Sequence, residues 1–316
     1  MITAEKEDCL ARRRGNVLGA MADTGEVEQV PVARAVLGEG AIWNSSRQRL
    51  NWIDIDGGRV FTYDPATGEN RVCEVGRKVG TVVPRARGGL MLAVHEGFAA
   101  LDPGNGRIEL WPRPPGHDPA VVRFNDGKCD PAGRFWAGTM ALARSPKPLG
   151  RLYRLDADGS VQVMLEDVGT SNGIAWSLDR RTLYFIDTPL LRADAFDYDV
   201  ASGAIGRRRT VISIPPGIGL PDGSTLDAEG MLWIAMYKGW SVTRWNPRTG
   251  ELLRTIRLPV ARVTSCAFGG PDLDTLFITS ARQDFTAEQL AAQPLAGCLF
   301  KVRPGVRGLP AFAFRG

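Results

Sequence analysis

The sequence predicts an all-β chain folded as a six-bladed β-propeller. Three observations favour this fold: two classes of turn alternate along the chain, short strand-like runs lie between them, and the unit they form recurs roughly every 40 to 45 residues. Six such units lie between about residues 32 and 302. A β-sandwich or two smaller β domains would also contain hairpins, but neither requires so regular a repeat.

The first class of turn closes one hairpin in most units. Asp or Asn opens several of these turns and Gly ends them, because Asp and Asn bond to the turn backbone and Gly allows a positive φ. Short alternating runs flank each turn, which is typical of antiparallel hairpins. These turns lie at residues 63–68, 101–106, 155–159, 198–203 and 245–250.

The second class of turn lies between turns of the first class, at residues 130–133, 177–181 and 227–230. A β-rich run follows each of them, and the runs at 51–54 and 275–279 occupy the same place in their own units. Two hairpins per unit give four strands, which is the content of a propeller blade. One short segment, 286–293, has a helical pattern and is expected to be an insertion.

The composition is ordinary for a water-soluble globular protein and indicates no nucleic-acid or membrane partner. The 316 residues are 44% hydrophobic and 23% charged, and 39 Lys and Arg nearly balance 35 Asp and Glu. The basic run at 207–209 is short and is interpreted as a solvated face. No apolar stretch approaches the roughly 20 residues needed to cross a bilayer.

The cysteines and the N-terminal segment bear on cellular location. The five cysteines are odd in number and widely spaced, and they include no CxxC pair, so a zinc ribbon or a redox pair is not indicated. Reduced thiols in a cytoplasmic protein fit best. The N-terminal segment is polar and lacks the apolar core of a signal peptide. We predict a disordered extension at 1–28 and a single propeller domain at 29–316.

Several common catalytic classes are excluded by residue count. Only two histidines are present, His95 and His117, so a three-histidine metal site is impossible, and no HExxH motif occurs. The chain has no GxxxxGK[ST] loop for a nucleotide. Both histidines are interpreted as loop or packing residues.

Four short motifs remain as candidates for chemistry. They are LGEG at 37–40, RFNDGK at 123–128, SNG at 171–173 and PDG at 221–223. Taken alone, most of these motifs are common turn sequences. In a propeller, however, the first strand of each blade lines the central channel, so Glu39, Asn125, Asn172 and Asp222 should converge on the axis. Their oxygens would form a cage for one divalent metal ion: Ca²⁺, Mg²⁺ or Mn²⁺, with Zn²⁺ and Fe²⁺ as alternatives.

At these motifs the chain resembles the gluconolactonase/regucalcin/senescence-marker-protein family of sugar lactonases. The resemblance runs from about residue 37 to the C-terminus and is strongest at 123–140, RFNDGKCDPAGRFWAGTM. Further matches lie at 171–177, 194–199, 221–223 and 259–270. The resemblance implies a six-bladed propeller with a central metal site that hydrolyses a small sugar lactone.

The resemblance also implies roles for individual residues. Glu39, Asn172 and Asp222 would hold the metal, and Asp222 would also act as general base. Asn125 would lie next to the metal, contacting it or holding substrate, and Arg123 would bind sugar oxygens. The metal would polarise the lactone carbonyl and activate a water molecule, while a carboxylate takes the proton.

The chain departs from the family pattern at two basic loops. Lys238, in YKGW, stands where many relatives have Gly or Asn, and residues 144–148 form a second basic loop. If Lys238, Arg192 or Lys147 reaches the channel mouth, the substrate would be an anionic lactone, such as a phosphorylated or sulfonated one. Otherwise these residues are ordinary solvated loop cations.

The leading functional prediction is a metal-dependent lactonase that converts an aldonolactone to the aldonic acid. One alternative keeps the site and changes the substrate to an organophosphate or aryl ester. A second alternative is a non-enzymatic, calcium-binding regulatory protein of the regucalcin type. The predicted partner is a small-molecule lactone, and the predicted assembly is a monomer or a small homo-oligomer.

Overall fold

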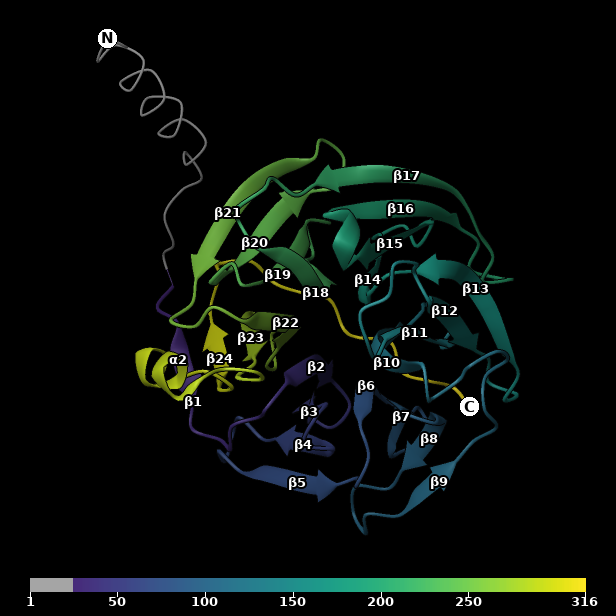
Figure 1. Ribbon diagram of the computed structural model, residues 1–316, viewed down its shortest axis with the longest axis horizontal. Helices are drawn as coiled ribbons and strands as arrows, with labels where there is room; N and C mark the ends of the chain where they lie inside the picture. Colours follow the sequence, from purple (N-terminus) through teal and green to yellow (C-terminus); the bar gives the residue numbers. More distant parts are fainter. Residues whose placement is uncertain (1–24) are drawn as a thin grey trace.

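Six four-stranded sheets surround a common axis in the computed structural model, which describes residues 25–316 (Figure 1). Neighbouring strands in every sheet pair antiparallel. The predicted six-bladed propeller is therefore confirmed. Of the predicted extension at 1–28, residues 1–24 lie outside the described part of the chain, and Glu28 is already the first residue of a strand.

The first three blades follow one another in the chain. Blade 1 consists of β2 (Gly38–Asn44), β3 (Arg49–Asp54), β4 (Arg59–Tyr63) and β5 (Asn70–Glu74). Blade 2 consists of β6 (Val79–Pro84), β7 (Leu90–Val94), β8 (Gly97–Leu101) and β9 (Ile108–Leu110). Blade 3 consists of β10 (Val122–Cys129), β11 (Phe135–Ala141), β12 (Gly150–Leu155) and β13 (Val161–Val168).

The other three blades complete the ring. Blade 4 consists of β14 (Ser171–Trp176), β15 (Thr182–Asp187), the 3₁₀ turn η1 (Thr188–Leu190), β16 (Arg192–Tyr198) and β17 (Ile205–Ser213). Blade 5 consists of β18 (Leu220–Leu226), β19 (Leu232–Tyr237), β20 (Ser241–Asn246) and β21 (Glu251–Arg257). Blade 6 consists of β22 (Val263–Gly269), β23 (Thr275–Ser280), α2 (Ala287–Ala292), β24 (Leu299–Val302) and β1 (Glu28–Val30).

Both predicted classes of turn are confirmed. Turns of the first class join the third and fourth strands of blades 1 to 5, and turns of the second class join the first two strands of blades 3 to 5. In the turn after β4, the Asp64 carboxylate accepts the backbone N–H of Ala66 at 2.9 Å, and Gly68 has a φ of +77°. The predicted helical insertion is α2, which begins with a capping box formed by Thr286 and Gln289.

A buried Asp–Trp pair anchors the first hairpin in two blades. Asp130 is fully buried, and its carboxylate accepts Trp136 Nε1–H at 3.0 Å and Arg134 Nε–H at 2.6 Å. In blade 5, Asp227 accepts Trp233 Nε1–H at 2.9 Å in the same way. Each carboxylate thus fixes a turn and a large core side chain together, because both of its oxygens have hydrogen-bond donors.

The ring is closed by strands from both ends of the described chain. β1 pairs with β24, so that blade 6 contains three strands from the C-terminal part and one from the N-terminal part. The side chain of Val30 is fully buried, and Lys301 Nζ lies 3.1 Å from Glu28 Oε2. The sequence pattern predicts no strand at 28–30.

The segment after β24 crosses the far side of the ring (Figure 1, fainter yellow trace). Gly308 N–H donates to Leu273 O in blade 6, and Phe314 N–H donates to Pro84 O in blade 2, both at 2.8 Å. Residues 309–312 lie against the far ends of inner strands from five blades. The central channel is therefore covered on that side. Among residues 25–316, no helix is long and apolar enough to span a membrane.

Candidate active site at the propeller axis

Each of the six inner strands departs from regular pairing in its first half. A bulge bends a strand and redirects its side chains, and such irregularities are common next to active sites. The irregular steps lie at Glu39/Ile42, Val79/Thr81, Phe124/Asp126, Asn172/Ile174, Pro221/Ser224 and Val263/Cys266. The four predicted site motifs therefore coincide with the points where the inner strands turn their side chains toward the axis.

Two glycines of these motifs are required by close packing between inner strands. A Cβ at Gly173 would lie 2.6 Å from Ser224 Oγ, and a Cβ at Gly223 would lie 2.7 Å from Ser265 Oγ. Real Cβ atoms do not come so close to neighbouring atoms. The glycines thus bring adjacent inner strands together around a narrow centre.

Glu39 and Asp222 bring two carboxyl groups together at this centre. The side chains are 3% and 8% exposed, and the two carboxyls lie close enough to interact directly. Burial raises the pKa of both carboxyls well above their ordinary values. The nearby carboxyl of Asp126 raises both pKa values further, while the Arg123 guanidinium lowers them. The carboxyls therefore repel one another in a site with little water.

Asn125 of blade 3 and Asn172 of blade 4 continue this cluster. Asn125 Nδ2 donates to Asn172 Oδ1 at 3.1 Å and to the Ser171 carbonyl at 2.9 Å. Arg123 Nη1 donates to Asn125 Oδ1 at 2.7 Å. Asn172 Nδ2 donates to Thr188 Oγ1 at 2.7 Å, so η1 supports the site directly. The four residues predicted to converge are thus neighbours at the axis, and Arg123 lies with them.

A second polar layer lies beside this cluster and was missed in the sequence. Burial raises the pKa of Asp126 to about 6, opposed by Lys128 and by the N–H of Gly127. Lys128 Nζ donates to the Ser224 carbonyl at 2.6 Å, and burial lowers the pKa of this amine. Both residues belong to the RFNDGK motif, so their residue types were a visible signal. Their burial depends on the irregular step at Asn125.

Lys238 is not part of the cluster. It is exposed in the turn between β19 and β20, with a φ of +60°, and its Nζ lies 5.9 Å from the centre of the Tyr237 ring. A role for Lys238 in substrate binding stays a prediction. Arg192, another cation predicted for the channel mouth, forms an ion pair with Asp194 at 3.0 Å.

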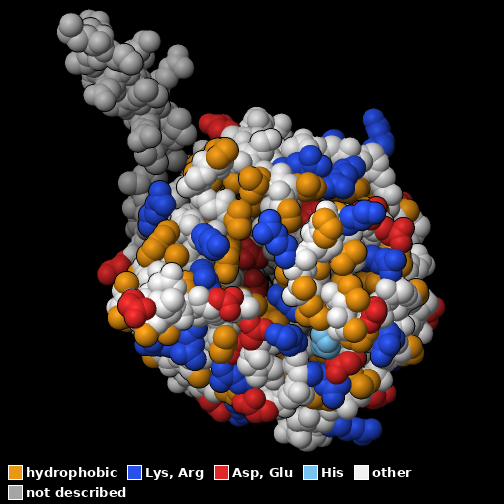
Figure 2. All heavy atoms as spheres, viewed as in Figure 1, with side chains coloured by type: hydrophobic (Ala, Val, Ile, Leu, Met, Phe, Trp, Pro, Cys, Tyr) orange, Lys and Arg blue, Asp and Glu red, His pale blue; other side chains and the backbone are white. Residues whose placement is uncertain are grey.

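The chemistry of the cluster fits a divalent cation. The carboxyls of Glu39, Asp126 and Asp222 outnumber the cationic groups of Arg123 and Lys128, and buried like charges are costly unless a cation offsets them. Within residues 25–316, no three His, Cys, Asp or Glu side chains are grouped as a metal site. An ion here would therefore need the amide oxygens as well. Figure 2 shows acidic side chains deep in a central hollow of the face that bears α2.

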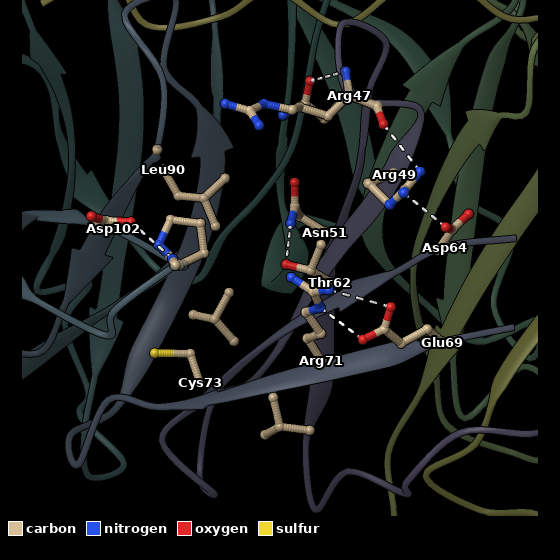
Figure 3. Close-up of a pocket in the computed structure, with 16 residues that line it drawn as sticks. Arg47, Arg49, Asn51, Thr62, Asp64, Glu69, Arg71, Cys73, Leu90 and Asp102 are labelled. Carbon is tan, nitrogen blue, oxygen red and sulfur yellow. Dashed lines mark hydrogen bonds and ion pairs between the residues drawn. The ribbon is translucent and has the colours of Figure 1, made fainter. Parts of the chain in front are cut away.

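A second cleft, of about 370 Å³, lies between blades 1 and 2, away from the axis (Figure 3). Its charged side chains pair with one another: Arg49 with Asp64 at 2.7 Å, and Arg71 with Glu69 at 2.8 Å. It contains none of the predicted site residues. The clustered, unbalanced carboxyls make the axis the better candidate for catalysis.

Comparison with known proteins identifies the family. A family model described as "SMP-30/Gluconolactonase/LRE-like region" matches residues 37–282. The chain belongs to this family. The predicted resemblance to gluconolactonases and regucalcins is therefore confirmed.

Individual members of the family resemble the chain over most of its length. Regucalcin of Danio rerio is 41% identical over 293 residues, covering 92% of this chain and 99% of that protein. A structure described as a calcium-binding protein, regucalcin, from Agrobacterium tumefaciens has a TM-score of 0.86 and 26% identity, covering 91% and 97% of the two chains. A gluconolactonase from Xanthomonas campestris has a TM-score of 0.72 and 25% identity, covering 90% and 92%.

Proposed function

We propose that the chain is a metal-dependent lactonase that hydrolyses an aldonolactone to the aldonic acid. Membership of a family that includes gluconolactonases supports lactone chemistry. The observation that carries the proposal is the pair of buried carboxyls at Glu39 and Asp222, which lies beside the amides of Asn125 and Asn172 at the axis.

Glu39, Asn172 and Asp222 are the residues proposed to hold one divalent ion. All three are at least nine-tenths buried and carry oxygen ligands, which suit Ca²⁺, Mg²⁺ or Mn²⁺ and leave Zn²⁺ and Fe²⁺ as alternatives. When bound, such an ion polarises a lactone carbonyl and lowers the pKa of a coordinated water molecule.

Proton transfer and substrate binding are assigned to other side chains of the same cluster and to Asp222. Asp222 is proposed to take the proton of the attacking water, because a buried carboxyl with a raised pKa is a better base at neutral pH than an exposed one. Arg123 is held by Asn125 and is proposed to donate hydrogen bonds to the ring hydroxyls or to the tetrahedral oxyanion. The cover on the far side of the channel leaves the hollow in Figure 2 as the entrance for substrate.

The test is acid release from gluconolactone and related lactones by protein that has been treated with a chelator and reloaded with each metal in turn. Asp222→Asn should keep the fold and lower kcat by at least about 100-fold, because general-base catalysis contributes about that much. Asp158→Asn, in the exposed turn after β12, is the matched control. Full activity in Asp222→Asn would remove this residue from the mechanism, and full activity after chelation would remove the metal.

An anionic lactone is proposed as a variant of the same substrate class. Lys238 is exposed in the β19–β20 loop of blade 5, and Arg144 and Lys147 lie in the β11–β12 loop of blade 3, on the same face. A phosphorylated or sulfonated sugar lactone in the panel should lose kcat/KM relative to its neutral analogue in Lys238→Ala. An unchanged ratio would assign Lys238 to the solvated surface.

The second candidate function is calcium binding without catalysis. It is favoured by the relatives called regucalcin, one of which is described as calcium-binding. The same carboxyl and amide oxygens would serve this function. Tight Ca²⁺ binding together with no hydrolysis across the lactone panel would support it over the lactonase.

A further inference from the structure

Apolar side chains gather around the entrance to the hollow. Of nine large hydrophobic side chains that are exposed among residues 25–316, five lie on loops of this face over blades 3 to 5. They are Val121, Leu142, Leu149, Leu190 and Trp240. Soluble monomers tend to scatter exposed hydrophobic residues singly, so a group on one face indicates a binding surface.

These side chains continue directly from the site residues. Leu142 N–H donates to Val121 O at 2.9 Å, at the end of the β10–β11 ladder that carries Arg123. Leu190 lies two residues after Thr188 in η1, and the Thr188 hydroxyl accepts a hydrogen bond from Asn172 at 2.7 Å. We refer to Val121, Leu142, Leu190 and Trp240 as the apolar rim.

Trp240 connects to the site through the strand before it. Trp240 closes the turn after Tyr237, and Tyr237 is paired across the ladder with Leu220, two residues before Asp222. The rim residues thus lie on loops of the face that bears the hollow, and the strands next to them carry the site residues.

Three of the four rim loops carry basic side chains or none. Residues 142–149, 188–191 and 238–240 contain Arg144, Lys147 and Lys238 and no Asp or Glu, whereas the loop before Val121 contains Asp118. The rim is therefore apolar and positive, whereas the base of the hollow is acidic (Figure 2). A ligand that is complementary to both the base and the rim has a polar ring at the base of the hollow and an apolar substituent at the entrance.

We infer that the apolar rim is a subsite for a hydrocarbon or aromatic substituent carried on the lactone ring. The inference rests on the proposed lactonase function and specifies its substrate class. The ring reaches the carboxyls and amides at the axis, while the substituent packs on Leu142, Leu190 and Trp240. Each methylene of the substituent that is buried on this surface increases the affinity for the lactone. Selectivity between lactones therefore arises from the substituent rather than from the ring.

The test compares two γ-lactones that differ only in the substituent, methyl against pentyl, on metal-loaded full-length protein. The pentyl compound should have a kcat/KM about tenfold higher, since four extra methylenes are only partly buried on an open rim. Leu190→Ser and Trp240→Ser should each reduce the ratio, and the double variant should bring it close to one. Leu178→Ser is the matched control, because Leu178 is 49% exposed in the turn after β14, on the other side of the ring. Thermal unfolding midpoints establish that each variant is folded.

The outcomes separate this inference from the proposed function. Hydrolysis of gluconolactone with no preference for the pentyl compound, or with a preference that the rim variants retain, overturns the inference alone. Loss of all lactone hydrolysis overturns both. A higher kcat/KM for aryl acetates than for any lactone, or a concentration-dependent dimer that Trp240→Ser abolishes, would assign the rim to another ligand and overturn the inference.

Discussion

At the scale of single residues, Glu39 and Asp222 place two buried carboxyl groups where their charges repel, and a bound cation would offset that repulsion. Their carboxyls are buried together; the N–H groups of Gly40 and Gly223 favour the charged forms, and the Arg123 guanidinium does so to a smaller extent. In the absence of metal, this repulsion should reduce the stability of the folded chain. With metal bound, the same charges become ligands and should stabilise the fold in proportion to the affinity.

Glu39→Gln should therefore have opposite effects with and without metal. In a chelator at neutral pH, the variant should be more stable than wild type, because it removes one of two facing buried charges. With Ca²⁺ or Mn²⁺, the variant should lose most of the increase in unfolding temperature that wild type shows. Urea unfolding in both conditions measures this, and a less stable variant in chelator would mean that the two carboxyls share a proton instead of repelling.

His117 gives a second residue-level prediction, on pH. Its ring is 4% exposed, Nε2 lies 2.7 Å from the His95 carbonyl, and burial lowers its pKa. Because the folded chain holds this histidine neutral, protonation favours the unfolded chain. The stabilising effect is present above the ordinary histidine pKa of about 6.5 and is lost as pH falls below it.

The measurement is the free energy of unfolding at pH 7.5 and pH 5.5 for wild type and His117→Gln, which keeps a donor for the carbonyl. Wild type should lose more unfolding free energy than the variant over this interval, because only wild type has the buried neutral imidazole. The carboxyl groups titrate in both proteins, so their contribution to the pH dependence is absent from the difference between wild type and variant. Equal losses would show that His117 is not responsible.

The residues at the axis also show how far the sequence could predict the site. Glu39, Asn125, Asn172 and Asp222 could be predicted because each lies near the start of the inner strand of its blade. Asp126 could not, since Asn-Asp-Gly is a common turn sequence that is usually exposed. Its burial follows from the step in register at Asn125, and a one-residue step leaves no periodic signal in the sequence.

At the scale of the secondary-structure elements, the hairpins were predictable because turn chemistry is local. Asp64 and Asp130 each bond to the backbone within their own turn, so the residues that cause the turn are adjacent in sequence. The second role of Asp130 was not visible, because its partner Tyr198 comes from another blade, with Oη–H donating at 2.8 Å. Asp130 therefore links two blades as well as shaping one turn.

Asp130→Ala should be among the more damaging substitutions outside the site. It would leave the Arg134 guanidinium, whose side chain is 10% exposed, without its carboxylate in the protein interior. Removal of one member of a buried ion pair costs about 3–5 kcal/mol. Asp102→Ala is the matched control: it lies in an exposed turn, accepts the N–H of Gly104, and should cost no more than about 1 kcal/mol. Chemical denaturation of both variants gives the two values, and similar losses would contradict the role assigned to Asp130.

At the scale of the whole molecule, the repeat predicted the number of blades but not the way the ring closes. β1 is only three residues long and has no alternating pattern, so nothing in residues 28–30 distinguishes a strand from a linker. The strand forms because β24 would otherwise present an unpaired edge, and an open edge is unfavourable. Closure is thus a property of the complete ring rather than of the segment itself.

Removal of β1 tests this account of ring closure. A chain that begins at residue 31 loses the ladder to β24, the buried side chain of Val30 and the ion pair between Glu28 and Lys301. These contacts together contribute about 3 kcal/mol or more, so the unfolding midpoint should fall by several degrees. A chain that begins at Gly25 retains β1 and is the matched control. Because the inner strands of blades 1 and 6 both contribute to the axis, the shorter chain should also lose metal-induced stabilisation. Equal midpoints and equal metal response in the two chains would show that blade 6 is complete without β1.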